Sequence, residues 1–217
     1  ETDSLREPLQ AVLTSPYVQN VSENALQILY WSGRVRCRME EKIDGFNVRI
    51  FRSGDGMLAL SRGGYVCPFA TDRVPDFIPM ALFEAHPDLV LCAELAGPDN
   101  PYTQGGPSFV TEDVRLFVFD MMRLGCPGFL LQEERRALCE EFDLPVPRTF
   151  GCFEPGDWRS ILGIVEQLDA DRREGAVFKE DFPLGHRTKY VTAWSGIYDI
   201  AVRAEDTYGA TEGLPSL

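Results

Sequence analysis

Two runs of alternating apolar and charged residues flank a short segment near the start of the chain. The first run covers residues 34–39, the second covers residues 47–52, and Asp44-Gly45 lies between them. Alternation with a period of two is typical of β-strands and Asp-Gly is a turn signal, so the sequence predicts a hairpin. Lys42 would then lie where a strand gives way to a tight turn, on a rigidly held backbone. A surface hairpin with a solvated lysine is the alternative interpretation.

Lysine is scarce throughout the chain. There are three lysines, Lys42, Lys179 and Lys189, against 18 arginines. The ε-amine of lysine can lose its proton and become a nucleophile, whereas a guanidinium stays charged. We therefore expect these three lysines to have roles that arginine cannot fill.

The formal net charge of −13 counts against a polyanionic partner, but the charge is unevenly spread. Residues 34–62 contain seven basic and four acidic residues, so the basic excess surrounds Lys42. A hydrophobic content of 44% is ordinary for a soluble globular protein. No apolar run approaches the roughly 20 residues of a membrane span, so no membrane partner is expected. The chain begins with Glu1 rather than Met, which suggests processing.

Six cysteines occur singly, without a Cys-x-x-Cys pair. This pattern argues against a zinc site and predicts free thiols in a reducing cytoplasm. His86 precedes a proline and His186 lies in a polar loop, and both are expected at the surface. With two histidines so placed, metal binding by histidine and Ser–His catalysis have little support.

The remaining pattern predicts an α+β fold of two mainly antiparallel sheets that flank a cleft, with helices outside. We expect one domain over residues 1–217, with helices in residues 1–31, mainly 4–31, and no separate C-terminal domain. The other predicted elements are strands at 57–61, 89–95, 115–120, 174–179 and 189–192, and helices at 72–86 (interrupted by prolines), 130–142 and 157–169.

Several polar or aromatic residues on these strands each have a structural explanation. Glu94 in an apolar strand is explained by a paired buried carboxylate, and Phe119 by core packing. Glu174 could mark a junction between loop and strand, and Lys189 an edge-strand charge. Their order along the chain favours a functional interpretation instead.

In that order the chain resembles the ATP-dependent polynucleotide ligases, which share a nucleotidyltransferase (ATP-grasp-like) domain with mRNA capping enzymes. It most resembles the archaeal-type RNA ligases that act as homodimers. The matching segments span about 150 residues and are Glu41-Lys42-Ile43-Asp44-Gly45-Phe46-Asn47, Ser61-Arg62-Gly63, Ala93-Glu94-Leu95-Ala96-Gly97, Phe117-Val118-Phe119-Asp120, Glu174-Gly175-Ala176-Val177-Phe178-Lys179 and Lys189-Tyr190-Val191.

The resemblance implies a chemistry. Unprotonated Lys42 would attack the α-phosphate of ATP and form a Lys42–AMP phosphoramidate. AMP would then pass to an RNA 5′-phosphate, and a 3′-hydroxyl would displace it to seal the strand, as in RNA repair. Lys179 and Lys189 would lower the pKa of Lys42 and stabilise charge on the phosphates.

The resemblance also implies the roles of single residues. Glu94 would bind the ribose hydroxyl, Phe119 would stack on adenine, and Asn47 would orient the phosphates. The other implied roles are nucleotide binding by Glu41 and Ile43, contact of Arg62 with the ribose or the nucleic-acid end, a grip on the α-phosphate by Lys179 and Lys189, and Mg²⁺ (or Mn²⁺) binding by Glu174.

The chain departs from the family pattern in two places. Its last motif reads Arg187-Thr188-Lys189 where the family often has Lys-x-Lys, so Arg187 could share the role of Lys189. The chain ends at Leu217, which leaves little room for the further domain that such ligases carry. A DNA ligase, a capping-type guanylyltransferase and a catalytically silent nucleic-acid-binding domain are the alternative functions.

Overall fold

The computed structural model describes residues 28, 31–103 and 106–195. The helices expected in residues 4–31 thus lie almost wholly outside the described residues. The chain divides into two compact units. The first unit comprises Glu1–Arg36, Phe153–Ala176 and Lys189–Leu217, and the second comprises Cys37–Cys152 and Val177–Thr188.

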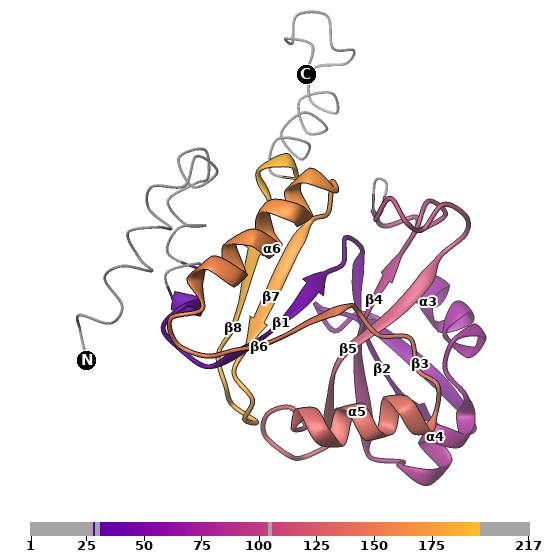
Figure 1. The fold of residues 1–217 in the computed structure, drawn as a ribbon. Helices are drawn as coiled ribbons and strands as arrows, with labels where there is room; N and C mark the ends of the chain where they lie inside the picture. Colours follow the sequence, from indigo (N-terminus) through magenta and orange to yellow (C-terminus); the bar gives the residue numbers. More distant parts are fainter. Residues whose placement is uncertain (1–27, 29–30, 104–105, 196–217) are drawn as a thin grey trace, which may run out of the picture. The chain divides into compact units, whose positions relative to one another are not determined.

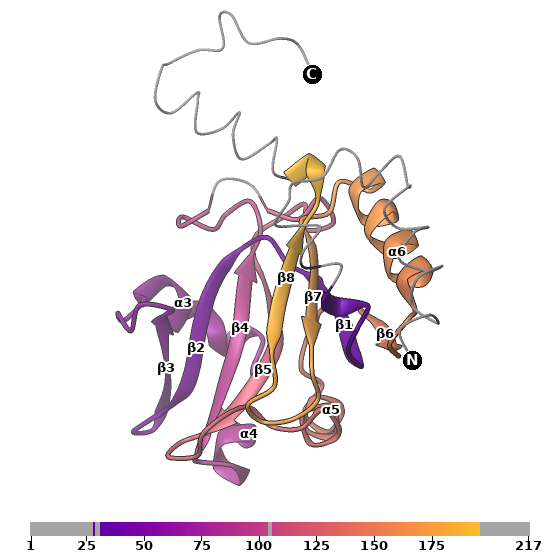
Figure 2. The ribbon, with the colours of Figure 1, turned by 90° about the vertical axis from the view of Figure 1, so that its left-hand side faces the viewer.

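The second unit contains a four-stranded antiparallel sheet in the order β3-β2-β4-β5 (Figure 2). Strands β2 and β3 form a hairpin with its turn at Gly54-Asp55, because Ser53 pairs with Gly56. The four strands are β2 (Phe46–Ser53), β3 (Gly56–Ser61), β4 (Leu89–Ala96) and β5 (Arg115–Arg123).

One face of this sheet forms the hydrophobic core of the second unit. Alternation along β2 buries Val48 and Ile50, and alternation along β4 buries Leu91 and Ala93. These side chains pack against residues of short helices in a proline-rich segment and of a longer helix after β5. The helices are α3 (Pro68–Arg73), the 3₁₀ turn η3 (Val74–Asp76), α4 (Met80–Ala85) and α5 (Gln132–Glu141).

Strand β5 contains a β-bulge at Phe119. Ala93 of β4 pairs with Val118 and Cys92 pairs with Asp120, so Phe119 is an extra residue without a counterpart on β4. A bulge of this kind bends the strand and changes the direction in which a side chain points. Phe119 and Asp120 therefore leave the strict alternation of the strand.

A second sheet has the order β6-β1-β7-β8 (Figure 1). The predicted hairpin of residues 34–39 with residues 47–52 is wrong, because β1 lies in this sheet and β2 in the other. β1 is a central strand, buried along nearly its whole length, and its Glu41 amide donates to the carbonyl of Arg148 on the β6 side (2.8 Å). The strands are β1 (Cys37–Lys42), β6 (Thr149–Phe153), β7 (Gly175–Lys179) and β8 (Arg187–Val191).

The α+β class and the two antiparallel sheets are thus confirmed, whereas a nucleotide cleft between sheets stays a prediction. In the first unit, α6 (Trp158–Ala170) buries one face, and its Trp158 ring leaves no room for a side chain at Gly33. No helix among the described residues has the length and apolarity needed to cross a membrane. All six cysteines are free thiols.

Candidate active site

Lys42 is the last residue of β1, and the chain enters β2 four residues later, at Phe46. Its neighbours Glu41 and Ile43 are buried, while Lys42 itself is half-buried. The backbone at Gly45 lies against the end of β4, because a Cβ there would stand 2.6 Å from the carbonyl oxygen of Leu95. Only glycine fits so close to the Leu95 carbonyl, so Asp44-Gly45 connects a strand of one sheet to a strand of the other rather than closing a hairpin.

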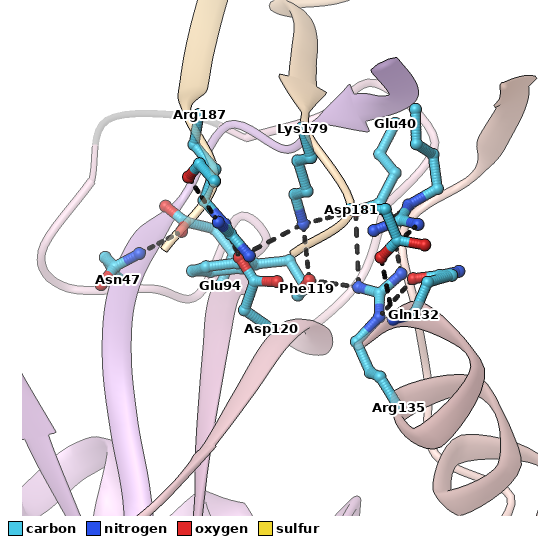
Figure 3. Close-up of polar contacts among 12 residues, drawn as sticks. Glu40, Asn47, Glu94, Phe119, Asp120, Gln132, Arg135, Lys179, Asp181 and Arg187 are labelled. Carbon is cyan, nitrogen blue, oxygen red and sulfur yellow. Dashed lines mark hydrogen bonds and ion pairs between the residues drawn. The ribbon is translucent and has the colours of Figure 1, made fainter. Parts of the chain in front are cut away.

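An ion pair anchors the chain just before Lys42. The Glu40 carboxylate accepts a hydrogen bond from the Lys179 ammonium, with 2.7 Å between Oε2 and Nζ (Figure 3). Arg38 and Arg135 also donate to Glu40. Two residues of extended chain span about 7 Å, so the backbone of Lys42 lies within that distance of Glu40.

A second contact anchors the chain just after Lys42. Asn47 pairs in register with Glu94, and its amide Nδ2 donates to the Glu94 carboxylate over 3.1 Å (Figure 3). Both side chains are half-buried, on the sheet face opposite to Val48 and Ala93. The segment that contains Lys42 is therefore fixed at one end to Lys179 and at the other end to Glu94.

The bulged residue Phe119 is held through its backbone. Its carbonyl oxygen accepts from Lys179 Nζ at 2.6 Å and from Arg135 (Figure 3). The ring centroid lies 5.6 Å from Lys179 Nζ and 5.9 Å from the guanidinium carbon of Arg49. An aromatic ring attracts cations to its face, so these contacts help to fix the ring.

Sequence reasoning missed Arg49 and Arg135. Arg49 lies two residues after Asn47, and strand alternation places both on one face, which is a signal that could have been used. Arg135 lies on α5 three and four residues before the buried Leu138 and Cys139, a helical spacing that could have distinguished it from its exposed neighbour Arg136.

Positive charge exceeds negative charge in this buried group. Its cations are Arg38, Arg135 and Lys179, and its carboxylates are Glu40 and Asp120, all with at most 6% of the side chain exposed. Buried charges are costly without partners, and the half-exposed Asp181 supplies a further carboxylate, with 3.7 Å between its Oδ1 and Nη1 of Arg38.

The ion pairs alter the pKa values of the two central groups. Burial would raise the pKa of Glu40, but the attraction of Lys179 and then Arg135 outweighs it and lowers this pKa to about 2. Burial also lowers the pKa of Lys179, although Glu40 and Asp120 oppose the shift. Glu40 is therefore ionised at neutral pH, and the nearby carboxylates favour the charged form of Lys179.

Arg187 has protein partners of its own. Its Nε donates to Asp120 at 3.2 Å and its Nη1 donates to the carbonyl of Gly185. Its guanidinium carbon lies 4.0 Å from the centroid of the Phe129 ring. These contacts hold the loop before β8 against β5, which gives Arg187 a structural role within the second unit.

Three other predicted site residues belong to other segments of the chain. Arg62 is exposed in the turn after β3, at the end of the sheet where β2 begins. Glu174 and Lys189 belong to the first unit, where Glu174 is half-buried and Lys189 is exposed. Glu174 directly precedes β7 and Lys189 lies in β8, and the two segments are close, because a Cβ at Gly175 would lie 1.9 Å from the carbonyl oxygen of Tyr190.

The donor set for a metal is sparse. Among the described residues there is no group of three or more His, Cys, Asp or Glu side chains that could hold a metal ion. A magnesium ion bound through one carboxylate, water and the phosphates of a substrate needs no such group. The half-buried carboxylate of Glu174 fits that mode of binding.

Comparison with known proteins begins with a family match. A family model described as RNA ligase matches residues 36–191. The match covers most of the chain and contains all six segments named from the sequence.

Solved structures and a curated relative are also similar to this chain. A candidate ATP-dependent DNA ligase from Aquifex aeolicus is 42% identical, with a TM-score of 0.79, and the match covers 86% of this chain and 52% of that one. An archaeal ATP-dependent RNA ligase is 31% identical, with a TM-score of 0.76, over 87% and 51% of the two chains. An uncharacterised protein from Methanocaldococcus jannaschii is 30% identical over 75% of this chain and 42% of its own. The chain thus spans about half the length of these proteins.

Proposed function

We propose that this chain, which belongs to the RNA ligase family, is the nucleotidyltransferase part of an ATP-dependent RNA ligase with Lys42 as its nucleophile. The observation that supports this most is the double anchoring of the Lys42 segment. Lys179 contacts Glu40 and Glu94 contacts Asn47, so residues from three of the matched segments take part in contacts that hold the chain two residues before and five residues after Lys42.

The reaction proceeds in three transfers. The unprotonated Lys42 amine attacks the α-phosphorus of ATP, a phosphorus–nitrogen bond forms, and pyrophosphate leaves. The phosphate of an RNA 5′ end then takes AMP from the lysine. Finally, an RNA 3′-hydroxyl attacks that 5′-phosphate, the phosphodiester forms and AMP leaves.

The polar face of the sheet provides the nucleoside contacts. Glu94 accepts from a ribose hydroxyl, Phe119 stacks on adenine, and Asn47 orients the phosphates. Glu41 and Ile43 flank the nucleophile and line the nucleotide site, and Arg62 contacts the ribose or the nucleic-acid end. The half-buried positions of Asn47 and Glu94 support these roles, because both remain accessible to a ligand.

Positive charge would prepare the phosphates for the transfer. Cations around the bound triphosphate would stabilise negative charge on the departing pyrophosphate. Lys179 supplies such charge behind Phe119, and the excess of buried cations there supports the idea. Lys189, exposed on β8, would grip the α-phosphate region.

Glu174 would hold a divalent cation, Mg²⁺ or Mn²⁺, directly or through water. When bound, the cation would neutralise charge on the triphosphate. A carboxylate together with phosphate oxygens is a donor set that suits this ion.

A DNA ligase with the same chemistry is the second candidate. The higher identity to the Aquifex aeolicus protein (42%) than to the archaeal RNA ligase (31%) favours it. Sealing of nicked duplexes that differ only in the sugar of the joined strand would separate the two candidates. Preferred sealing of nicked RNA is the expected result.

Incubation with α-labelled ATP and Mg²⁺, followed by a denaturing gel, tests the proposal. We expect covalent label on the unaltered chain and none on Lys42→Ala or Lys42→Arg. Arg52→Met is the control and should label normally. Arg52 lies on β2, as Asn47 does, but its guanidinium donates to the carbonyl of Gly54. Label that survives Lys42→Ala would refute the proposal, and label from GTP instead of ATP would indicate a capping-type enzyme.

A further inference from the structure

Arg49 shares the polar face of the β3-β2-β4-β5 sheet with Asn47 and Glu94. Alternation along β2 places Asn47 and Arg49 on one face and the buried Val48 and Ile50 on the other. In register, Asn47 lies opposite Glu94 and Arg49 lies opposite Cys92. Arg49 therefore lies next to the residue proposed as the ribose ligand.

A directional chain of hydrogen bonds connects these side chains. Arg49 Nη1 donates to Oδ1 of Asn47, and Nδ2 of Asn47 donates to Oε2 of Glu94 over 3.1 Å. A guanidinium only donates and a carboxylate only accepts, whereas an amide has one end of each kind. Arg49 thus fixes the amide of Asn47 in the one orientation that presents its NH₂ group to Glu94.

The guanidinium itself is held in place. Nη1 of Arg49 also donates to the carbonyl of Val48 at 3.3 Å. The guanidinium carbon of Arg49 lies 5.9 Å from the centroid of the Phe119 ring. The residue opposite, Cys92, is fully buried, and burial raises the pKa of its thiol to about 11. At neutral pH no thiolate draws Arg49 away from Asn47.

We propose that Arg49 is a positioning residue that gives the site its selectivity for the nucleotide ribose, by orienting Asn47 and through it the carboxylate of Glu94. The inference rests on the proposed function, in which Glu94 binds a ribose hydroxyl. A carboxylate in one fixed orientation accepts a hydrogen bond from a ribose hydroxyl at one position only. A carboxylate that rotates freely discriminates poorly between a ribose and a deoxyribose.

Nucleotide affinity measured in the Lys42→Ala background tests the proposal, because no adenylate then forms. Titration calorimetry compares ATP with 2′-deoxyATP and 3′-deoxyATP. We expect the chain to prefer ATP over at least one deoxy analogue by about tenfold or more. Arg49→Met and Asn47→Asp should each bring that ratio close to one, since the carboxylate introduced by Asn47→Asp has no hydrogen to donate to Glu94. Arg49→Lys should recover part of the ratio.

Arg52→Met is the matched control and should keep the full ratio, and a thermal melt of each variant monitors folding. Equal loss of affinity for ATP and for the deoxy analogues in Arg49→Met would overturn the inference, because Arg49 would then act on the triphosphate or on folding. An unchanged ratio in Arg49→Met would also overturn it, and would leave the role of Glu94 intact. Absence of any preference in the parent chain would overturn both the inference and the ribose role of Glu94.

Discussion

The ammonium of Lys179 and the carboxylate of Glu40 lie 2.7 Å apart, and each side chain is only 1% exposed. The pair links β1, two residues before Lys42, to the end of β7. Removing one member of such a pair leaves an uncompensated buried charge, which costs about 3–5 kcal/mol. The integrity of the site and the stability of the second unit therefore depend on the same contact.

Acid should destabilise the chain through Glu40. Its pKa falls from the ordinary 4.5 to about 2 in the folded state, so its contribution to stability is present above pH 4.5 and disappears as the pH falls toward 2. A shift of this size corresponds to roughly 3 kcal/mol. Urea unfolding at a series of pH values measures it. Glu40→Gln should be less stable at pH 7, and its free energy of unfolding should change less with pH over this range. Glu141→Gln, at an exposed position, should follow the parent chain.

Arg135 and Glu40 should be energetically coupled. Arg135→Met leaves Glu40 with fewer cations and removes one donor from the Phe119 carbonyl, so a loss of about 3 kcal/mol or more is expected. The double variant with Glu40→Gln should lose less than the sum of the two single variants, by at least about 1 kcal/mol. Strictly additive free energies of unfolding in this double-mutant cycle would argue against the coupling.

Phe119 should contribute to ATP binding through its ring. Phe119→Ala removes a stacking surface worth about 1–3 kcal/mol, which corresponds to a rise in the KM for ATP of roughly 5- to 150-fold. Phe119→Tyr keeps the ring and should stay close to the parent chain. The KM comes from the rate of covalent labelling at increasing ATP concentration, and an unchanged value for Phe119→Ala would exclude the stacking role.

Gly45 should tolerate no side chain. In Gly45→Ala the new Cβ would meet the Leu95 carbonyl at 2.6 Å and Cβ of Ala96 at 2.9 Å, so the Lys42 segment must shift. We expect a loss of about 1–3 kcal/mol in stability, together with weaker labelling. Gly56→Ala is the control, because nothing lies within 4 Å of its Cβ. Equal melting temperatures for the two variants would contradict this account.

Most of the secondary structure could be predicted from the sequence, because it follows from local periodicity. The strand at 89–95 and the helices at 130–142 and 157–169 were placed within a few residues of their observed bounds. β6 was not predicted, since its five residues include Gly151 and have no clear alternation. The order of the six ligase segments was sufficient to indicate the family.

Strand pairing was harder to predict. The Asp44-Gly45 turn suggested a hairpin, but the strands on either side of it belong to different sheets. A local turn signal does not report that β1 already has β6 and β7 as neighbours. The contacts of Arg135 with Glu40 and with the Phe119 carbonyl join positions far apart in the sequence, so no local pattern could reveal them.

The bulge at position 119 makes the choice of side chain there independent of the pairing between β5 and β4. In a regular strand a change of side chain alters the fit with the neighbouring strand, but Phe119 has no counterpart on β4. The size and shape of this ring can therefore vary without disturbing the pairing of Val118 or Asp120. Under the proposed stacking of Phe119 on adenine, preference for one nucleobase over another would be open to adjustment at a single position, independently of the sheet that supports it.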